Sequence, residues 1–204
     1  MYIPLHYRNE DLEEVAEFLR SNAFAVLVSQ VAGKSWATHL PLELETDASG
    51  KQVLTGHIAK ANPQWRHFDE NETVLAIFNG PHAYISSSWY QEEEVPTWNY
   101  IAVHVYGKLR ILTEEEVMAS LHRLVDKYEK GSKHPISLDK LSPKTLRQVK
   151  GVVGFQITVD QIQAAYKLSQ GRENDHARIF EELQERNALG DKEIAAKLNR
   201  EKQE

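Results

Sequence analysis

The chain has 204 residues, no cysteine and a formal net charge of −6 at pH 7. This length predicts one domain, or one domain with an appendage, and is enough to bury a hydrophobic core without cross-links. The lack of cysteine excludes disulfides and thiolate metal sites, and the acidic balance argues against a generic polyanion-binding surface.

No segment of the sequence indicates a membrane protein. The longest apolar runs, such as residues 24–28, are far shorter than the roughly 20 residues that cross a bilayer. The first 14 residues lack the basic and then apolar pattern of a signal peptide. We therefore expect a cytoplasmic protein with no membrane partner.

The first half of the chain predicts one helix followed by short strands. Asn9 is the expected N-cap of the helix, because apolar residues from Leu12 onward recur at helical spacing. Asn62 and Pro63 are expected to begin a second helix. Strands with turns between them are expected at residues 23–31, 36–45, 52–58, 73–79 and 83–86, the last two separated by Gly80-Pro81.

The second half predicts further strands and then helices. A long strand over 100–112 is expected to break or bend at Gly107. Thr113 and Glu116 form the pattern of a capping box that opens a helix to about residue 128. A short helix from residue 142 and a strand at 152–159 follow. Residues 161–172 fit either a helix or a strand, and we favour a strand that ends near residue 169. Helices at about 175–187 and from 191 complete the chain. This order predicts an α+β, mainly β protein, with a barrel or sandwich and flanking helices.

Aromatic residues gather in the segment 80–106, which holds half of all Trp and Tyr residues of the chain. Flat rings beside hydroxyl and amide groups suit a planar ligand with polar edges. The alternative is that these rings form the core of a β-protein, because aromatic residues favour strands. The six residues are Tyr84, Trp89, Tyr90, Trp98, Tyr100 and Tyr106.

Two basic segments are candidate seats for an anion. Residues 56–63 leave a strand and enter a helix, and Lys60 places a positive charge just before free backbone N–H groups. Residues 167–172 hold a second basic cluster. Each segment has an ordinary alternative, a capped helix or a solvated turn. Pro41 lies inside a strand pattern and predicts an edge or bulge at that point.

Other catalytic and metal-binding patterns are weak. His39, His57, His82 and His104 fall on or beside strands without the spacing of a metal site, so no metal is predicted. The serines at 86–88 have no identifiable base, and catalytic residues remain unknown. The C-terminal segment 173–204 is close to charge-balanced and lacks a recognition helix after its last predicted helix, which favours helices that pack on the barrel or on a partner subunit.

Seven blocks of the sequence form an ordered pattern: THLPL (38–42), GHIAKANPQW (56–65), GPHAYISSSWY (80–90), VPTWNY (95–100), VHVYGKLR (103–110), GVVGFQI (151–157) and AAYKLSQGR (164–172). In this order they resemble the signature blocks of the PaiB-type FMN-binding negative transcriptional regulators. Gly171 departs from the asparagine that is common in the family, and Ser87 from a proline.

The resemblance implies a flavin-binding split β-barrel of Greek-key type over residues 1–172, followed by a helical extension over 173–204. It also implies a homodimer with FMN at the subunit interface, and repression of degradative-protease and sporulation genes. DNA as a partner rests on this resemblance alone, because the sequence shows no complete DNA-reading motif.

By analogy with split barrels, the resemblance also implies a set of FMN-binding residues. Four residues would line the isoalloxazine edge: Thr38, His39, Leu40 and Pro41. Lys60 and Asn62 would hold the phosphate. A stacking wall would come from the second subunit, formed by Trp89, Trp98 and Asn99. The phosphate or substrate side would be closed by Lys167, Gln170 and Arg172.

Two alternatives to a flavin-bound regulator remain open at this point. The first is a flavin-dependent oxidoreductase or reductase that acts on a small molecule, which turnover with NAD(P)H would indicate. A haem-binding split barrel is the second alternative, in which His39, His57 or His104 would serve the haem.

Overall fold

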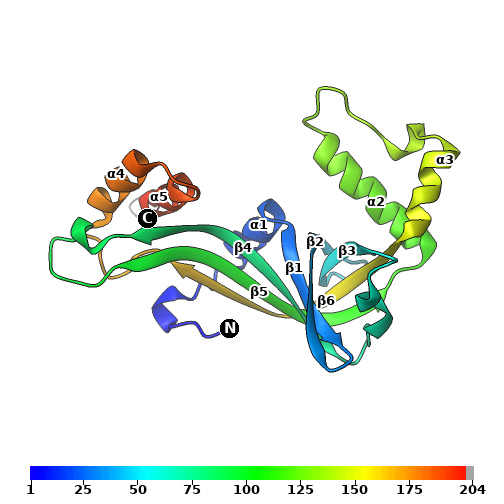
Figure 1. Cartoon of the computed structure of the whole chain (residues 1–204), viewed down its shortest axis with the longest axis horizontal. Coiled ribbons are helices and arrows are strands. Elements are labelled where there is room, and N and C mark those ends of the chain that lie inside the picture. The colour runs from blue at the N-terminus through cyan, green and yellow to red at the C-terminus, as the bar shows by residue number, and fades with distance from the viewer. Residues whose placement is uncertain (201–204) are drawn as a thin grey trace. The chain divides into compact units, whose positions relative to one another are not determined.

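The computed structural model describes residues 1–200 and shows a mainly β protein, as the sequence predicts. Within these residues, six strands form a closed barrel in the order β1-β2-β3-β6-β5-β4. They are labelled in Figure 1. The strands are β1 (Phe24–Val31), β2 (Lys34–Thr46), β3 (Gln52–Ala59), β4 (Thr73–Ile85), β5 (Thr97–Ile111) and β6 (Val152–Lys167).

The helices lie before, between and after the strands. No helix in the described part of the chain is long and apolar enough to cross a membrane. The α-helices are α1 (Leu12–Ser21), α2 (Glu114–Glu129), α3 (Pro143–Leu146), α4 (His176–Arg186) and α5 (Asp191–Arg200). The short 3-10 helices are η1 (Leu5–Tyr7), η2 (Pro63–His67), η3 (Ser87–Trp89), η4 (Leu138–Lys140) and η5 (Arg147–Gly151).

The chain forms two compact units, and strands β4, β5 and β6 each run through both. Unit 1 holds Met1–Phe18, Asn79–His104 and the described residues from Gln163 onward. Unit 2 holds Leu19–Phe78 and Val105–Ile162. The division predicted at residue 172 stays a prediction.

Two predicted strand breaks are wrong. Strand β4 runs through Gly80-Pro81, and β6 runs through residue 160 to Lys167. Gly80 is needed for packing and does not make a turn: a Cβ atom there would lie 2.6 Å from Cε2 of Phe18. Turn-forming residues can therefore lie inside long barrel strands when a neighbouring side chain occupies the space that a Cβ would need.

Gly107 likewise does not break its strand, because β5 continues from Thr97 to Ile111. A Cβ atom at Gly107 would lie 2.1 Å from the carbonyl oxygen of Thr158. The glycine therefore permits the close approach of β6 to β5, which are neighbours in the barrel.

The two predicted N-caps have different outcomes. The cap of α1 is Asp11, whose Oδ1 accepts the N–H groups of Glu13 at 2.9 Å and Glu14 at 3.0 Å. Asn9 acts one step earlier, because its Oδ1 accepts the N–H of Asp11 at 2.9 Å. Asn62 does cap the turn that follows it, but this turn is the short η2 helix of Pro63–His67.

The capping box that opens α2 is confirmed. Thr113 Oγ1 accepts the N–H of Glu116, and the Glu116 carboxylate accepts the N–H of Thr113 at 2.9 Å. Arg110 donates to both carboxylate oxygens, at 2.8 and 3.1 Å. These hydrogen bonds, the one from Arg110 above all, lower the pKa of Glu116 to about 2.

We expect Glu116→Gln to remove a pH-dependent part of the stability. The pKa of Glu116 is depressed in the folded state, so its contribution is complete above the ordinary value of 4.5 and is lost as the pH falls toward about 2. The free energy of unfolding of wild type should exceed that of Glu116→Gln at pH 6, and the gap should shrink with acid in urea titrations. Glu115→Gln, an exposed change in the same turn, should show no such trend. A gap that is constant from pH 6 to pH 3 would contradict this account.

Candidate functional site

Strand β2 changes its neighbour at Pro41. Its first part pairs with β1 as far as Pro41↔Phe24, and its second part pairs with β3 from Leu42↔Gly56 onward. Pro41 thus lies where the ladder with β3 begins, and the N–H that proline lacks is not needed there. Pro41 is the last residue of β2 paired with β1, and the edge or bulge predicted at this proline stays a prediction.

A hydrogen-bonded group, which we call the Thr38 cluster, joins β2 to the turn after β3. It consists of Thr38, Asn62 and Gln64. Asn62 Nδ2 donates to Thr38 Oγ1 at 2.9 Å, and Thr38 Oγ1 donates to Gln64 Oε1 at 2.6 Å. The N–H of Gln64 donates to Asn62 Oδ1 at 3.0 Å. Two residues predicted for the site, Thr38 and Asn62, are therefore brought together.

Gln64 is the member of this cluster that sequence reasoning missed. Its side chain is fully buried, and its Nε2 donates to Ser29 Oγ at 2.9 Å. Gln64 therefore ties β1 to β2 and to the turn at residue 62. The sequence gives one weak signal for Gln64, its position directly after Pro63 in the block NPQW. A polar residue in the first turn of a helix is normally expected at the surface, so this signal does not predict burial.

Lys60 lies in the same turn as Asn62, directly after the end of β3. Its backbone N–H donates to Gly151 at 2.8 Å, and its carbonyl accepts Trp65 Nε1 at 2.9 Å, so the backbone is held on both sides. The ammonium group makes no ion pair within residues 1–200. Burial lowers the pKa of His57 on β3, which favours its neutral form. An ammonium without an ion pair in the described residues, two positions before the amide of Asn62, supplies donors suited to an anionic oxygen.

The residues predicted to line a ring edge on β2 alternate between two faces. Leu40 is buried in the core, whereas His39 is exposed. The ring of His39 stacks near Phe24, with centroids 6.4 Å apart at 29°. Phe24 is 67% exposed. The exposed rings of His39 and Phe24 thus lie together in unit 2, on the face of β2 opposite the buried Leu40.

In unit 1, the three residues predicted as a stacking wall have different surroundings. Trp89 is buried, with the guanidinium of Arg186 5.1 Å from its ring centre. Asn99 is fully buried and bonds Ser169 at 2.9 Å. Only Trp98, 53% exposed, offers a ring face to solvent.

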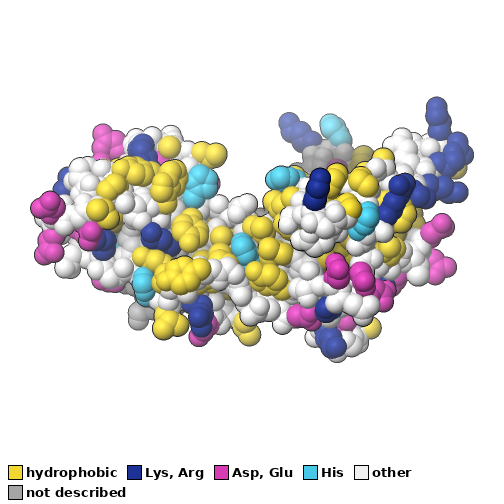
Figure 2. Space-filling model, turned by 60° about the horizontal axis from the view of Figure 1, so that its bottom comes forward, with side chains coloured by type: hydrophobic (Ala, Val, Ile, Leu, Met, Phe, Trp, Pro, Cys, Tyr) yellow, Lys and Arg dark blue, Asp and Glu magenta, His cyan; other side chains and the backbone are white. Residues whose placement is uncertain are grey.

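Trp98 belongs to an exposed aromatic group on strands β4 and β5. Its ring centre lies 5.5 Å from that of His82 and 6.0 Å from that of Tyr84. Figure 2 shows that hydrophobic side chains reach the surface in patches on one face of the protein. Tyr84 and Trp98 are the exposed rings among the Trp and Tyr residues of segment 80–106, so a ligand or partner can reach them from solvent.

The three residues predicted to close the site at the end of β6 all have hydrogen-bond or ion-pair partners within unit 1. Lys167 Nζ donates to Thr97 at 2.5 Å. Gln170 folds back on its own turn and donates to Tyr166 at 2.7 Å. Arg172 pairs with Glu94 and, at 3.9 Å, with Asp175. The charge of Arg172 is therefore balanced by carboxylates in this structure.

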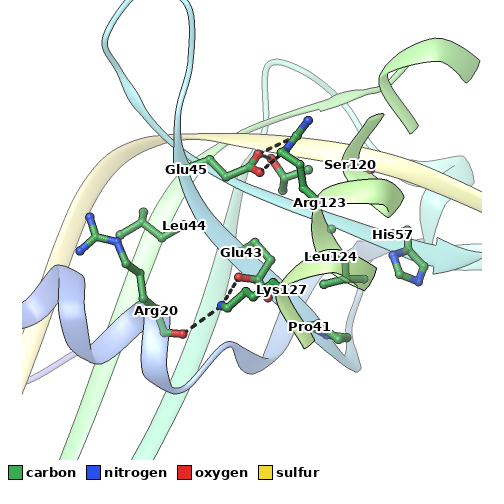
Figure 3. A pocket seen from close by; sticks show the side chains of 12 residues that line it. Arg20, Pro41, Glu43, Leu44, Glu45, His57, Ser120, Arg123, Leu124 and Lys127 are labelled. Atoms are coloured by element: carbon green, nitrogen blue, oxygen red, sulfur yellow. Dashed lines mark hydrogen bonds and ion pairs between the residues drawn. The ribbon is translucent and has the colours of Figure 1, made fainter. Parts of the chain in front are cut away.

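A pocket of about 260 Å³ lies in unit 2 between α2 and strands β2 and β3 (Figure 3). Two ion pairs cross it: Lys127 Nζ to Glu43 at 2.5 Å and Arg123 Nε to Glu45 at 2.6 Å. Burial works against ionisation of Glu45, but hydrogen bonds from Arg123 and Thr55 outweigh it and lower the pKa of Glu45. Because these four charges are paired with one another, they offer little net attraction to an ion.

Metal ligands do not gather in the described part of the chain. Residues 1–200 contain no group of three His, Asp or Glu side chains that could hold a metal ion. The four histidines lie within strands β2, β3, β4 and β5. The candidate chemistry considered below rests on the Thr38 cluster, Lys60 and the exposed rings.

Comparison with known proteins gives a clear family. Residues 1–161 match a family model described as "Putative FMN-binding domain". The chain is 48% identical over 197 residues to the Protease synthase and sporulation protein PAI 2 of Bacillus subtilis, which covers 96% of this chain and 95% of that protein. It is also 28% identical over 212 residues to an uncharacterized protein of Emericella nidulans, covering 83% of this chain and 84% of that protein.

Solved structures show the same fold. The flavocytochrome Anf3 of Azotobacter vinelandii has a TM-score of 0.61 at 16% identity, over 78% of this chain and 69% of its own. The FAD and heme binding protein of Mycobacterium smegmatis has a TM-score of 0.60 at 13% identity, over 79% and 73%. At these identities the similarity concerns the fold alone, and it confirms the predicted split β-barrel.

Proposed function

The chain belongs to the PaiB-type family of FMN-binding domain proteins, and from this membership we propose that it binds FMN as a cytoplasmic homodimer and acts as a negative transcriptional regulator. The observation that carries the proposal is the 48% identity along 96% of the chain to the Bacillus subtilis protein, together with the FMN-binding family match. Regulation of protease and sporulation genes follows from the same kinship.

The residues of unit 2 fit the polar end of a flavin nucleotide. Lys60 has an ammonium without an ion-pair partner in the described residues, and Asn62 has a second amide hydrogen beyond the one that it gives to Thr38. We assign the phosphate to these two residues. The isoalloxazine ring would lie along residues 38–41, near the exposed rings of His39 and Phe24. FMN, when bound, supplies redox chemistry at this ring.

The second subunit completes the proposed site. Trp98 is the exposed ring that a homodimer would add to the flavin, with Trp89 and Asn99 as the buried support behind it. Lys167, Gln170 and Arg172 are assigned to the outer side of the site. Arg172 would have to release Glu94 to meet a phosphate, which makes it a weaker candidate than Lys60.

Lys60→Ala should weaken FMN binding about ten- to a hundredfold, because a charge-assisted hydrogen bond is worth about 1.5–3 kcal/mol. Quenching of tryptophan fluorescence during FMN titration measures this. Lys34→Ala, an exposed lysine at the start of β2, is the matched control and should leave binding unchanged. An unchanged dissociation constant for Lys60→Ala would place the phosphate elsewhere.

The absorbance spectrum of the purified protein, followed by FMN titration of colourless material, tests the proposal as a whole. Flavin bands or saturable FMN binding support it, and NAD(P)H oxidation would then show whether the flavin also serves an enzyme. A Soret band would replace it with the haem-binding alternative. For the regulatory part, promoter DNA should bind with a steep loss of affinity as salt rises, and no binding at low salt would exclude direct contact.

A further inference from the structure

A second pocket in unit 2 has a different chemistry from the proposed flavin site. It has a volume of about 490 Å³ and lies between α2, the α3–η5 segment and the first residues of β6. These elements are the green and yellow parts of unit 2 in Figure 1. Eight of its thirteen lining residues are Ile, Leu, Val or Met, and Trp65 adds the one aromatic ring. This apolar pocket is large enough for a small ligand.

The charges at the apolar pocket are mainly positive. Lys60 and Lys150 both line it, with Glu114 as the single acid. Neither lysine has an ion-pair partner within residues 1–200. Glu114 lies in the first turn of α2, where the helix dipole favours a carboxylate. An excess of unpaired ammonium groups beside an aliphatic wall complements a ligand with an apolar body and one anionic end.

We propose that the apolar pocket binds a small amphipathic carboxylate. Its hydrocarbon part would pack on Val149, Val153 and neighbouring side chains, and its carboxylate would meet Lys150. FMN fits this pocket less well, because a flavin needs polar partners along its ring edge and along its ribityl chain, and the walls here are aliphatic. The inference therefore goes beyond the proposed FMN site.

Decanoate is the probe, titrated into the full chain by calorimetry. Saturable binding is expected, and decanol, which has the same chain without charge, should bind at least tenfold more weakly. Lys150→Ala should weaken decanoate about tenfold or more, and Val149→Glu, which places a carboxylate in the apolar wall, should abolish binding. Lys144→Ala is the matched control on the same segment, exposed and outside the pocket, and should leave the affinity unchanged.

Lys60 is left intact in this experiment, because it is also assigned to FMN. Circular dichroism shows whether Val149→Glu is folded, and Lys150→Ala changes only an exposed side chain. No saturable decanoate binding, or equal binding of decanol, overturns the proposal. Loss of FMN affinity in Val149→Glu equal to the loss of decanoate affinity also overturns it, since the pocket would then belong to the flavin. Normal FMN binding without decanoate binding would contradict the proposed carboxylate site and would leave the proposed FMN-binding function unaffected.

Discussion

Replacing Gly107 with alanine should lower the free energy of unfolding by about 3 kcal/mol or more, the upper end of the usual cost of overpacking. The added Cβ would lie 2.1 Å from the carbonyl oxygen of Thr158 and 2.7 Å from Cγ2 of Ile157. The nearest atom belongs to the backbone of β6, so it cannot move aside as a flexible side chain would. Relief requires strands β5 and β6, which are neighbours in the barrel, to separate.

Urea unfolding followed by circular dichroism measures this change, with the midpoint shifting and the slope preserved. Gly131→Ala is the matched control, because a Cβ there meets nothing within 4 Å and the backbone needs no positive φ. Its effect should stay within the roughly 0.5 kcal/mol typical of surface changes. Equal stabilities of the two variants would mean that β6 does not approach β5 as described.

Local sequence patterns predict a helix start correctly when residues a few positions away form its cap. The capping box at Thr113 and Glu116 and the helix starts near residues 175 and 191 depend on contacts within a few positions of the chain. The mainly β class likewise follows from alternation along each strand. These features needed no knowledge of distant contacts.

Strand length was harder to predict, because distant partners set it. Gly80-Pro81 reads locally as a turn, yet the ring of Phe18, far away in the sequence, requires a glycine there and β4 continues. The break or bend predicted at Gly107 has the same origin, and β5 continues through this residue. A glycine whose missing Cβ makes room for a neighbour looks identical in sequence to one that makes a turn.

The sequence also does not predict which of the candidate site residues are buried. Trp89 and Trp98 lie in one aromatic segment, yet the first is buried under Arg186 and the second is exposed. Asn99 could have met a ligand, but it bonds Ser169, seventy positions further on, inside the core. Periodicity shows which residues share a face of a strand, but it does not show which face another segment will cover.

Gln64→Ala should destabilise the protein by about 2–4 kcal/mol, because each buried polar group left without a partner costs about 1–3 kcal/mol. The change removes the acceptor of Thr38 at 2.6 Å and the donor to Ser29 at 2.9 Å. Ser29 is itself buried, so water does not readily replace the lost bond. Chemical unfolding measures the loss. Gln52→Ala, an exposed glutamine on β3, is the control and should be nearly neutral.

The same variant separates two roles in the proposed FMN site. In the proposed site Lys60 would meet the phosphate directly, so its removal should weaken FMN binding without loss of stability. Gln64 acts by positioning, because its amide holds Thr38 and its backbone N–H holds Asn62. Gln64→Ala should therefore lower both stability and FMN affinity, and Gln64→Glu, which keeps the acceptor for Thr38, should recover part of the affinity. A large loss of stability with unchanged FMN binding would show that the Thr38 cluster supports the barrel alone and that the flavin lies elsewhere.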